Sequence, residues 1–407
     1  MLRAGLHDKM YRAMRKMNTT TNNFRLKSSD DGLSQYQVIF SKSNNIFTNL
    51  ALEDWFYQNV DFSAIGGVLL MWCNERAVVI GRHQNPWTEC SISTCERNGV
   101  AVARRNSGGG TVYHDMGNLN CSFLSPRSKY NRKTNLGIIC SALRKTWNLD
   151  VCISHREDIL LNKDFKISGT ASKLGRNNSY HHCTVLVNVD RTLLHSVLNK
   201  DTHGIESKAT ESVKANVINL TEICSEVSVE HLVEAIAREY QDFYHVPVSK
   251  MCFLSLHPSE TGFPGLFDMV NHFSSWKWIF GWTPSFKIHK RYLLSMDISN
   301  VTLAEPSVYT CGAQCEISLT KKISLPELEV TLTVYKGLIQ KILLNPQLIS
   351  DKLFHQLNEL LCGTQLIVTE VSSVLEEWKK CAGNCDDKQN MEFTVICIKN
   401  LVTSAYC

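Results

Sequence analysis

Three successive glycines, residues 108–110, stand between a pair of arginines, Arg104 and Arg105, and the residues His114 and Asp115. Because glycine has no side chain, the backbone amides of such a stretch can approach a ligand closely, and the arginines add positive charge for an anionic group. The pattern therefore predicts a loop that binds a phosphate-like group. The alternative is a flexible surface turn, but such turns rarely lead straight into a strand-like run such as residues 111–113.

This glycine segment differs from the two common phosphate-binding loops. No Gly-Lys-Ser/Thr sequence follows the glycines, and their spacing is not that of a dinucleotide-binding fingerprint. A P-loop NTPase and a Rossmann dehydrogenase are therefore disfavoured.

A second segment with chemical character covers residues 165–173, where Lys166 is followed by Gly169 and Ala171. Shortly after it comes the pair His181 and His182, at the start of an apolar strand-like run.

Composition sets broad limits on function. Of the 407 residues, 43% are hydrophobic and 20% are charged, which describes an ordinary globular protein with room for two domains. The formal net charge of +4 gives little support to nucleic-acid binding.

The 16 cysteines are scattered and expected to be reduced. The close pairs Cys311/Cys315 and Cys381/Cys385 lack further zinc ligands at usual spacing, so no metal site is expected.

The first 34 residues are rich in arginine and lysine and resemble a mitochondrial presequence, with a merely disordered basic tail as the alternative. Near-helical spacing gives them an apolar stripe of Leu2, Leu6, Met10, Met14 and Met17. No run reaches the roughly 18 apolar residues of a membrane span, so a soluble protein without membrane contact is expected.

The apolar patterns further along predict a mixture of hairpins and separate helices. The expected elements are a strand at 38–40, a helix from 49, a buried hairpin of 68–72 with 77–80, a strand at 100–103, a helix at 136–147, a hairpin of 159–161 with 165–169 and a strand at 183–187. This mixture favours an α/β fold with a mixed sheet over a regularly wound parallel sheet. Beyond a boundary near Pro284, strand 330–335 and helix 349–361 predict a small α+β domain.

Together, the two chemical segments resemble the lipoate-protein ligase and lipoyltransferase family. That family shares an arginine-flanked Ser-Gly-Gly-Gly loop, a His-Asp-x-Gly-Asn sequence, a Lys-x-x-Gly-x-Ala strand and a His-His pair, all present here in order. The resemblance implies a biotin/lipoate-ligase-like catalytic domain at residues 35–286 and a small accessory domain at 287–407. With the presequence at 1–34, the chain is most similar to the mitochondrial lipoyltransferases, which implies the mitochondrial matrix.

The resemblance implies transfer of a lipoyl or octanoyl group to one lysine of the lipoyl domains of 2-oxo acid dehydrogenase acyltransferase subunits. The donor would be lipoyl-AMP or a lipoylated carrier such as the glycine-cleavage H protein. Lys166 would be the catalytic residue, bridging the acyl carbonyl and the phosphate. The residues implied to bind lipoyl-AMP are Arg105, Ser107, Gly110, Tyr113, His114, Asn118, Arg156, Lys166, His182, Thr184, Val213 and Ala215.

Three alternatives remain open at the level of sequence. A complete ligase would also use ATP and magnesium, but the stretch 208–220 departs from the bacterial pattern, which argues against it. A non-catalytic protein that binds lipoyl domains is a second possibility, and the intact Lys166 argues against that. A thioester on Cys183 is the third, with simple packing the favoured role for this cysteine. No permanently bound cofactor is expected, and the protein is expected to be a monomer.

Overall fold

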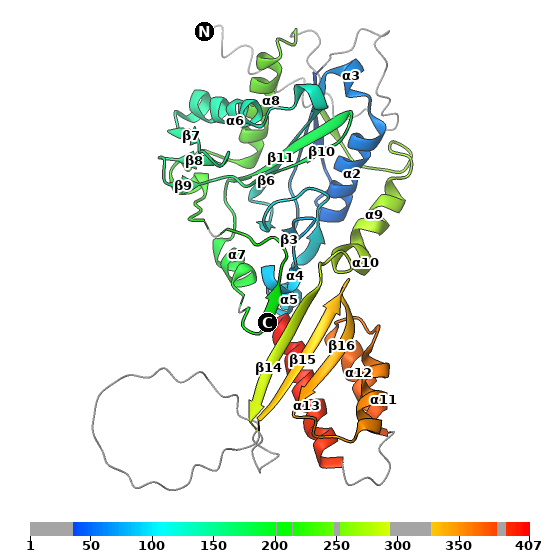
Figure 1. Ribbon diagram of the computed structural model, residues 1–407. Helices are drawn as coiled ribbons and strands as arrows, with labels where there is room; N and C mark the ends of the chain where they lie inside the picture. The colour runs from blue at the N-terminus through cyan, green and yellow to red at the C-terminus, as the bar shows by residue number, and fades with distance from the viewer. Residues whose placement is uncertain (1–35, 201, 214, 248–252, 294–326, 381–387) are drawn as a thin grey trace, which may run out of the picture. The chain divides into compact units, whose positions relative to one another are not determined.

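The computed structural model describes residues 36–200, 202–213, 215–247, 253–293, 327–380 and 388–407 (Figure 1). The expected presequence and both close cysteine pairs lie outside these residues. The described residues divide into two compact units, one up to residue 199 and from 210 to 279, the other from 200 to 209 and from 280 onward. The second unit thus begins at residue 280 rather than 287 and takes in residues 200–209, which the sequence analysis placed in the catalytic domain.

A six-stranded mixed sheet forms the centre of the first unit (Figure 1). Strand β1 runs parallel to its two neighbours, β2 and β13, whereas the other neighbouring strands run antiparallel. The mixed sheet expected from the sequence is therefore present. In spatial order its strands are β10 (Thr170–Leu174), β11 (Asn178–Leu186), β6 (Asn118–Pro126), β2 (Gly67–Trp72), β1 (Tyr36–Ser41) and β13 (Phe253–Leu256).

Both faces of this sheet are covered, which explains why β2 is apolar along its whole length. Side chains alternate between the faces of a strand, so Leu69 and Met71 enter one core while Leu70 and Trp72 enter another. Figure 1 shows α6 and α8 on the first face and α2 with α9 on the second. These helices are α2 (Ile46–Asn59), α6 (Arg132–Trp147), α8 (Val229–Phe243) and α9 (Leu266–Ser274).

Two small sheets of the first unit carry the motifs found in the sequence. In one, β3 (Ala77–Ile80) lies between β4 (Ala101–Arg104), which is parallel to it, and β5 (Val112–His114), which is antiparallel. In the other, β8 pairs with both β7 and β9. The strands of this second sheet are β7 (Val151–Ile153), β8 (Ile159–Leu161) and β9 (Phe165–Lys166).

The predicted pairing of residues 68–72 with 77–80 is wrong, although both strands exist. Strand β2 belongs to the central sheet and β3 to a separate one. The intervening Asn74 is completely buried and its side chain is bound by Asn49 and His114, so the chain passes between sheets instead of closing a hairpin. The second predicted hairpin is confirmed, because β8 and β9 pair antiparallel.

Short helices complete the first unit. They are α3 (Phe62–Ile65), α4 (Pro86–Glu89), α5 (Ile92–Arg97), α7 (Arg191–Leu198), α10 (Trp276–Ile279) and the 3-10 turns η2 (Arg127–Lys129) and η3 (Leu220–Glu222).

The second unit has a four-stranded antiparallel sheet of β12 (Ile205–Ser207), β14 (Phe286–Leu293), β15 (Glu327–Tyr335) and β16 (Leu338–Asn345). Along β15 the buried side chains alternate with more exposed ones, as in a sheet with one covered face. Its helices are α11 (Asp351–Leu361), α12 (Val368–Lys380) and α13 (Lys388–Tyr406). None of the helices in the described ranges combines the length and apolar character needed to cross a bilayer.

Candidate functional site

The glycine loop joins β4 to β5, and Arg104 at the end of β4 is completely buried. Its Nε donates to the carbonyl of Ile279 (2.8 Å), and its Nη1 donates to the carbonyls of Arg82 and Gln84 (2.9 Å each). The guanidinium therefore fastens α10 and the loop after β3. The expectation that Arg104 supplies charge to a ligand is wrong, because its side chain is enclosed by these carbonyls.

Arg105 shapes the glycine loop from within. Its Nη2 donates to the carbonyls of Gly108 and Gly110 (2.7 Å each), its Nη1 to the carbonyl of Val79 (2.9 Å) and its Nε to Ser107 Oγ (3.0 Å). The side chain is nearly buried, and the loop carbonyls turn inward toward it. Because these carbonyls point toward Arg105, the backbone amides of the loop are free to face the opposite side. Amides arranged in this way suit the binding of an anion.

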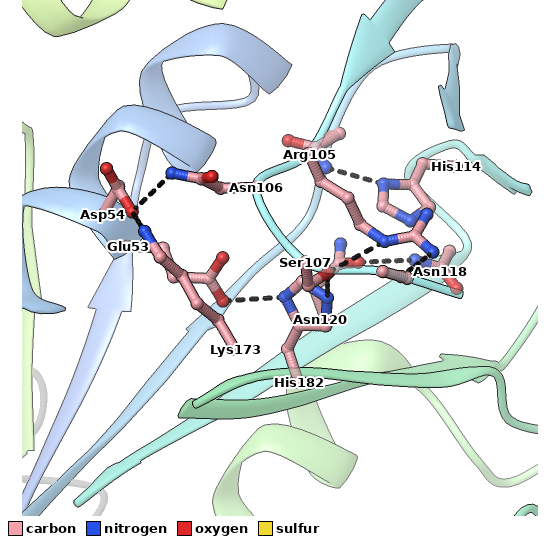
Figure 2. Close-up of polar contacts among 12 residues, drawn as sticks. Glu53, Asp54, Arg105, Asn106, Ser107, His114, Asn118, Asn120, Lys173 and His182 are labelled. Atoms are coloured by element: carbon pink, nitrogen blue, oxygen red, sulfur yellow. Dashed lines mark hydrogen bonds and ion pairs between the residues drawn. The ribbon is translucent and has the colours of Figure 1, made fainter. Parts of the chain in front are cut away.

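A buried row of polar side chains supports the same loop from β11 and α2 (Figure 2). His182 Nδ1 lies 2.8 Å from Glu53 Oε1, and His182 Nε2 lies 2.8 Å from Ser107 Oγ. Since the Glu53 carboxylate only accepts, His182 carries its proton on Nδ1, and Ser107 donates to Nε2. Both nitrogens of His182 are thus engaged in holding the loop.

The next residue of α2 holds the loop at a second point. Asp54 Oδ1 accepts from Asn106 Nδ2 (3.0 Å) and from Lys173 Nζ on β10 (2.6 Å), as Figure 2 shows. The Lys173 ammonium also lies 4.3 Å from the ring centre of Tyr57. Glu53 and Asp54, which follow each other on α2, therefore connect this helix to β10, β11 and the glycine loop.

His114, at the end of β5, is held in one tautomer by a chain of buried amides. Ser41 Oγ donates to Asn49 Oδ1 (2.7 Å), Asn49 Nδ2 donates to Asn74 Oδ1 (2.9 Å), and Asn74 Nδ2 donates to His114 Nδ1 (2.9 Å). The imidazole proton therefore sits on Nε2. Burial, with the nearby positive charge of Arg105, lowers the pKa of His114 to about 3, so the ring is neutral.

Lys166 lies on β9 opposite this loop. Its Nζ is 3.1 Å from Asp158 Oδ1, and about a quarter of its side chain is exposed. Its backbone N donates to the carbonyl of Asn216 (3.0 Å), and its carbonyl accepts from the backbone N of Ile218 (3.3 Å). The lysine is thus positioned by β8 on one side and by residues 216–218 on the other.

A cavity of about 340 Å³ separates the glycine loop from Lys166. Its size falls in the range of small-molecule sites, and its lining joins apolar side chains to a few convergent polar ones. Charged side chains cluster on the wall formed by Arg132, Arg156, Asp158 and Lys166. The arrangement fits an elongated ligand with an apolar part and an anionic part.

Comparison with known proteins agrees with this geometry. The family model of the lipoyl protein ligase A/B catalytic domain matches residues 45–241. The chain is 41% identical over 267 residues, 65% of its length, to the mitochondrial lipoyl amidotransferase LIPT1 of Homo sapiens, of which 71% is covered. This chain belongs to the lipoate-protein ligase family.

Two further relatives belong to the same family. A lipoate-protein ligase A from Bdellovibrio bacteriovorus is 37% identical over 63% of this chain and 75% of its own length. The crystal structure of LipL1 from P. falciparum in complex with lipoate aligns with a TM-score of 0.54 and 25% identity, covering 90% of this chain and 99% of that one. The family and the fold class predicted from the sequence are confirmed.

Most residues that the family resemblance singled out meet at the cavity. Arg156 is exposed there and makes no hydrogen bond or ion pair with the described residues, and Thr184 Oγ1 accepts from Gly169 N (2.9 Å). Cys183 also lines the cavity and is nearly buried. The predicted residues that line it are Arg105, Gly110, His114, Arg156, Lys166, His182, Thr184 and Val213.

Four predicted residues do not line the cavity. Tyr113 points to the opposite side of β5 from its neighbours Val112 and His114, because side chains alternate along a strand. Ser107 is covered by its partners in the loop. The others are Asn118, which is buried and donates to Asn120 Oδ1 (3.2 Å), and Ala215, which is exposed outside the cavity.

The sequence analysis did not single out several polar residues of the cavity wall, among them Asp158, Arg132 and Ser212. Arg132 pairs with Glu157 (3.0 Å), and Ser212 Oγ accepts from the backbone N of Thr111 (2.8 Å). One sequence signal could have indicated Asp158: it ends a charged run, residues 156–158, that lies directly before an apolar strand. No cluster of metal-binding side chains occurs among the residues the structure describes.

Proposed function

We propose that this chain transfers a lipoyl group from lipoyl-AMP, or from a lipoylated carrier such as the glycine-cleavage H protein, to a lysine of lipoyl domains of 2-oxo acid dehydrogenase acyltransferase subunits. The observation that carries the proposal is the position of Lys166, whose partly exposed ammonium lines the cavity across from the glycine loop. Family membership and the human relative's name as an amidotransferase support it. An octanoyl group is the alternative acyl group.

The chemistry follows from the charges around the cavity. An acyl-adenylate places a negative phosphate next to the reacting carbonyl, and cations there stabilise the charge that develops on attack. Lys166 would contact both the carbonyl and the phosphate. Arg156 has a guanidinium without a partner among the described residues, so it can bind a phosphate oxygen when a ligand enters.

The walls of the cavity supply the remaining interactions. The glycine-loop amides would contact the phosphate, while the apolar side chains Leu50, Trp72 and Val79 give the hydrocarbon chain of a lipoyl group a surface to pack against. Thr184 and Val213 would border the nucleotide. Lipoyl-AMP enters as a substrate in this proposal, and no permanently bound cofactor is required.

A complete ligase that also activates lipoate with ATP and magnesium is the second candidate. The relative from Bdellovibrio bacteriovorus is named a lipoate-protein ligase and shares 37% identity with this chain, which favours testing it. The mitochondrial matrix is the proposed location, supported by the name of the human relative and by the basic character of residues 1–34.

The test is mass spectrometry of an apo-lipoyl domain incubated with the purified chain and one of three donors: lipoate with ATP and magnesium, lipoyl-AMP, or lipoylated H protein. Transfer from the adenylate or the carrier alone identifies a dedicated transferase. Transfer from all three identifies the complete ligase. If no donor gives a modification that depends on Lys166, the enzymatic proposal fails and a non-catalytic lipoyl-domain-binding protein remains.

A further inference from the structure

The acceptor in the proposed reaction is a lysine ammonium, which cannot attack a carbonyl until it loses a proton. At neutral pH nearly all of a free lysine side chain is protonated, because its ordinary pKa is about 10.4. A transferase therefore benefits from a basic group beside the reacting carbon. The described part of the cavity wall offers few groups that could act in this way.

Both histidines at the cavity are unsuited to the task. His182 uses one nitrogen on Glu53 and the other on Ser107. His114 accepts from Asn74 at Nδ1 and carries its own proton on Nε2, and its pKa of about 3 makes it a weak base. Neither ring has an available lone pair for the proton of an incoming amine.

Two carboxylates line the cavity in the described residues, Asp158 and Glu211. Only Asp158 contacts Lys166, through Oδ1 at 3.1 Å from Nζ. Since Lys166 marks the reacting carbonyl in the proposed function, Asp158 stands at the reacting end of the cavity. Glu211 belongs to an exposed loop and forms no ion pair with Lys166.

The carboxylate of Asp158 is well positioned and only partly used. The backbone N of Asp158 donates to Ser154 Oγ (3.1 Å), and its carbonyl accepts from the backbone N of Ser154 (2.8 Å), which fixes the residue directly before β8. About a seventh of its side chain is exposed. Its second oxygen, Oδ2, has no hydrogen-bond partner among the described residues, so it is available to a ligand.

We infer that Asp158 is the general base that accepts a proton from the acceptor lysine of the lipoyl domain. This inference rests on the proposed function. One proton passes from the ammonium to Oδ2, and the freed lone pair forms the N–C bond to the acyl carbon. The C–O bond of the mixed anhydride then breaks, and the second proton leaves the nitrogen with the departing AMP phosphate.

Other charged groups surround this carboxylate. Lys166 faces it from β9, Arg156 and Glu157 precede it in the same loop, Arg132 faces it from the start of α6, and Glu211 lies on the exposed loop that also lines the cavity. A carboxylate accepts a proton through an oxygen that is not already occupied, which for Asp158 is Oδ2.

The test compares two nucleophiles with one donor. Preformed lipoyl-AMP is given to the full chain together with either an apo-lipoyl domain or hydroxylamine, which is largely uncharged at neutral pH and needs no base. Asp158→Asn keeps the shape and an oxygen for Lys166 but removes the basic group. Asp164→Asn, an exposed acid in the turn between β8 and β9, is the matched control.

The expected result is a loss of transfer to the lipoyl domain of about 10²-fold or more in Asp158→Asn, with the hydroxylamine reaction within about 3-fold of the unsubstituted chain. Raising the pH should partly restore lysine transfer in this variant, because the amine then loses its proton to solvent. Asp164→Asn should leave both reactions unchanged.

Two outcomes would overturn the inference while leaving the proposed function intact. Equal losses with both nucleophiles would make Asp158 a residue that only positions Lys166. Full lysine transfer by Asp158→Asn would exclude any need for this base. If the unsubstituted chain transfers to neither nucleophile from lipoyl-AMP, the proposed function itself is wrong for that donor.

Discussion

The two walls of the cavity are built in different ways. On the glycine-loop wall, the polar side chains of Arg105, His182 and Glu53 are almost entirely buried and bind one another or the loop backbone. On the opposite wall, Lys166 and Arg156 are partly or largely exposed. The first wall is pre-organised to hold a ligand, whereas the second keeps its charges available for the reaction.

The largest expected effect is a loss of transfer activity with little change in the free energy of unfolding. Lys166→Ala should lower transfer from lipoyl-AMP by about 10³-fold, because in the proposed reaction it removes the ammonium that stabilises developing charge. The free energy of unfolding should change by less than about 0.5 kcal/mol, since the side chain is partly exposed. Mass spectrometry and urea unfolding measure the two quantities. Lys133→Ala, at an exposed position of α6, is the control, and equal losses in both variants would contradict the division between walls.

The next effect concerns stability on the buried wall. Glu53→Ala should lower the free energy of unfolding by about 2–4 kcal/mol, because it leaves His182 Nδ1 without an acceptor and opens a space beneath β11. Glu53→Gln keeps an acceptor oxygen and should cost less. Denaturant titration at neutral pH compares the two variants, and equal losses would show that the charge of Glu53, which both variants lack, matters more than its hydrogen bond.

A smaller loss is expected from the glycine loop itself. Gly109 has a φ of 86°, where a side chain is disfavoured, and an added Cβ would lie 3.1 Å from Arg105 Nη2. Gly109→Ala should therefore destabilise by about 1–2 kcal/mol. Gly108→Ala meets no atom within 4 Å and should change stability little. A thermal unfolding series of both variants checks the difference, and equal midpoints would mean that the loop is not held as described.

The smallest effect is a pH dependence on the buried wall. Burial lowers the pKa of His114 from 6.5 to about 3, so between these values the unfolded chain binds more protons than the folded one. Stability should therefore fall as pH falls through this window, with His114 contributing about 1 kcal/mol between pH 6 and pH 5. His114→Asn should show a shallower decline in urea titrations, and an unchanged slope would refute the assignment.

The sequence predicts those features of the structure that a local pattern of residues determines, and it fails where contacts between distant residues decide. The family and mixed sheet follow from motifs and apolar runs, and the family resemblance predicts that Lys166 lies at the ligand site, where it lines the cavity. The pairing of β2 and β3 does not follow, because a fully apolar strand is compatible with either a hairpin or separate sheets. The buried role of Arg104 also depends on carbonyls as distant in sequence as Ile279, which no local pattern specifies.

The short strand β9 connects Lys166 to a second part of the cavity wall. Through its backbone, Lys166 is bonded to Asn216 and Ile218, and the same stretch of chain follows residues 210–213 of the cavity wall. A ligand that displaced residues 210–213 would therefore be expected to shift the backbone of Lys166 as well. In the proposed reaction, this would couple binding of the acyl donor to the placement of the Lys166 ammonium.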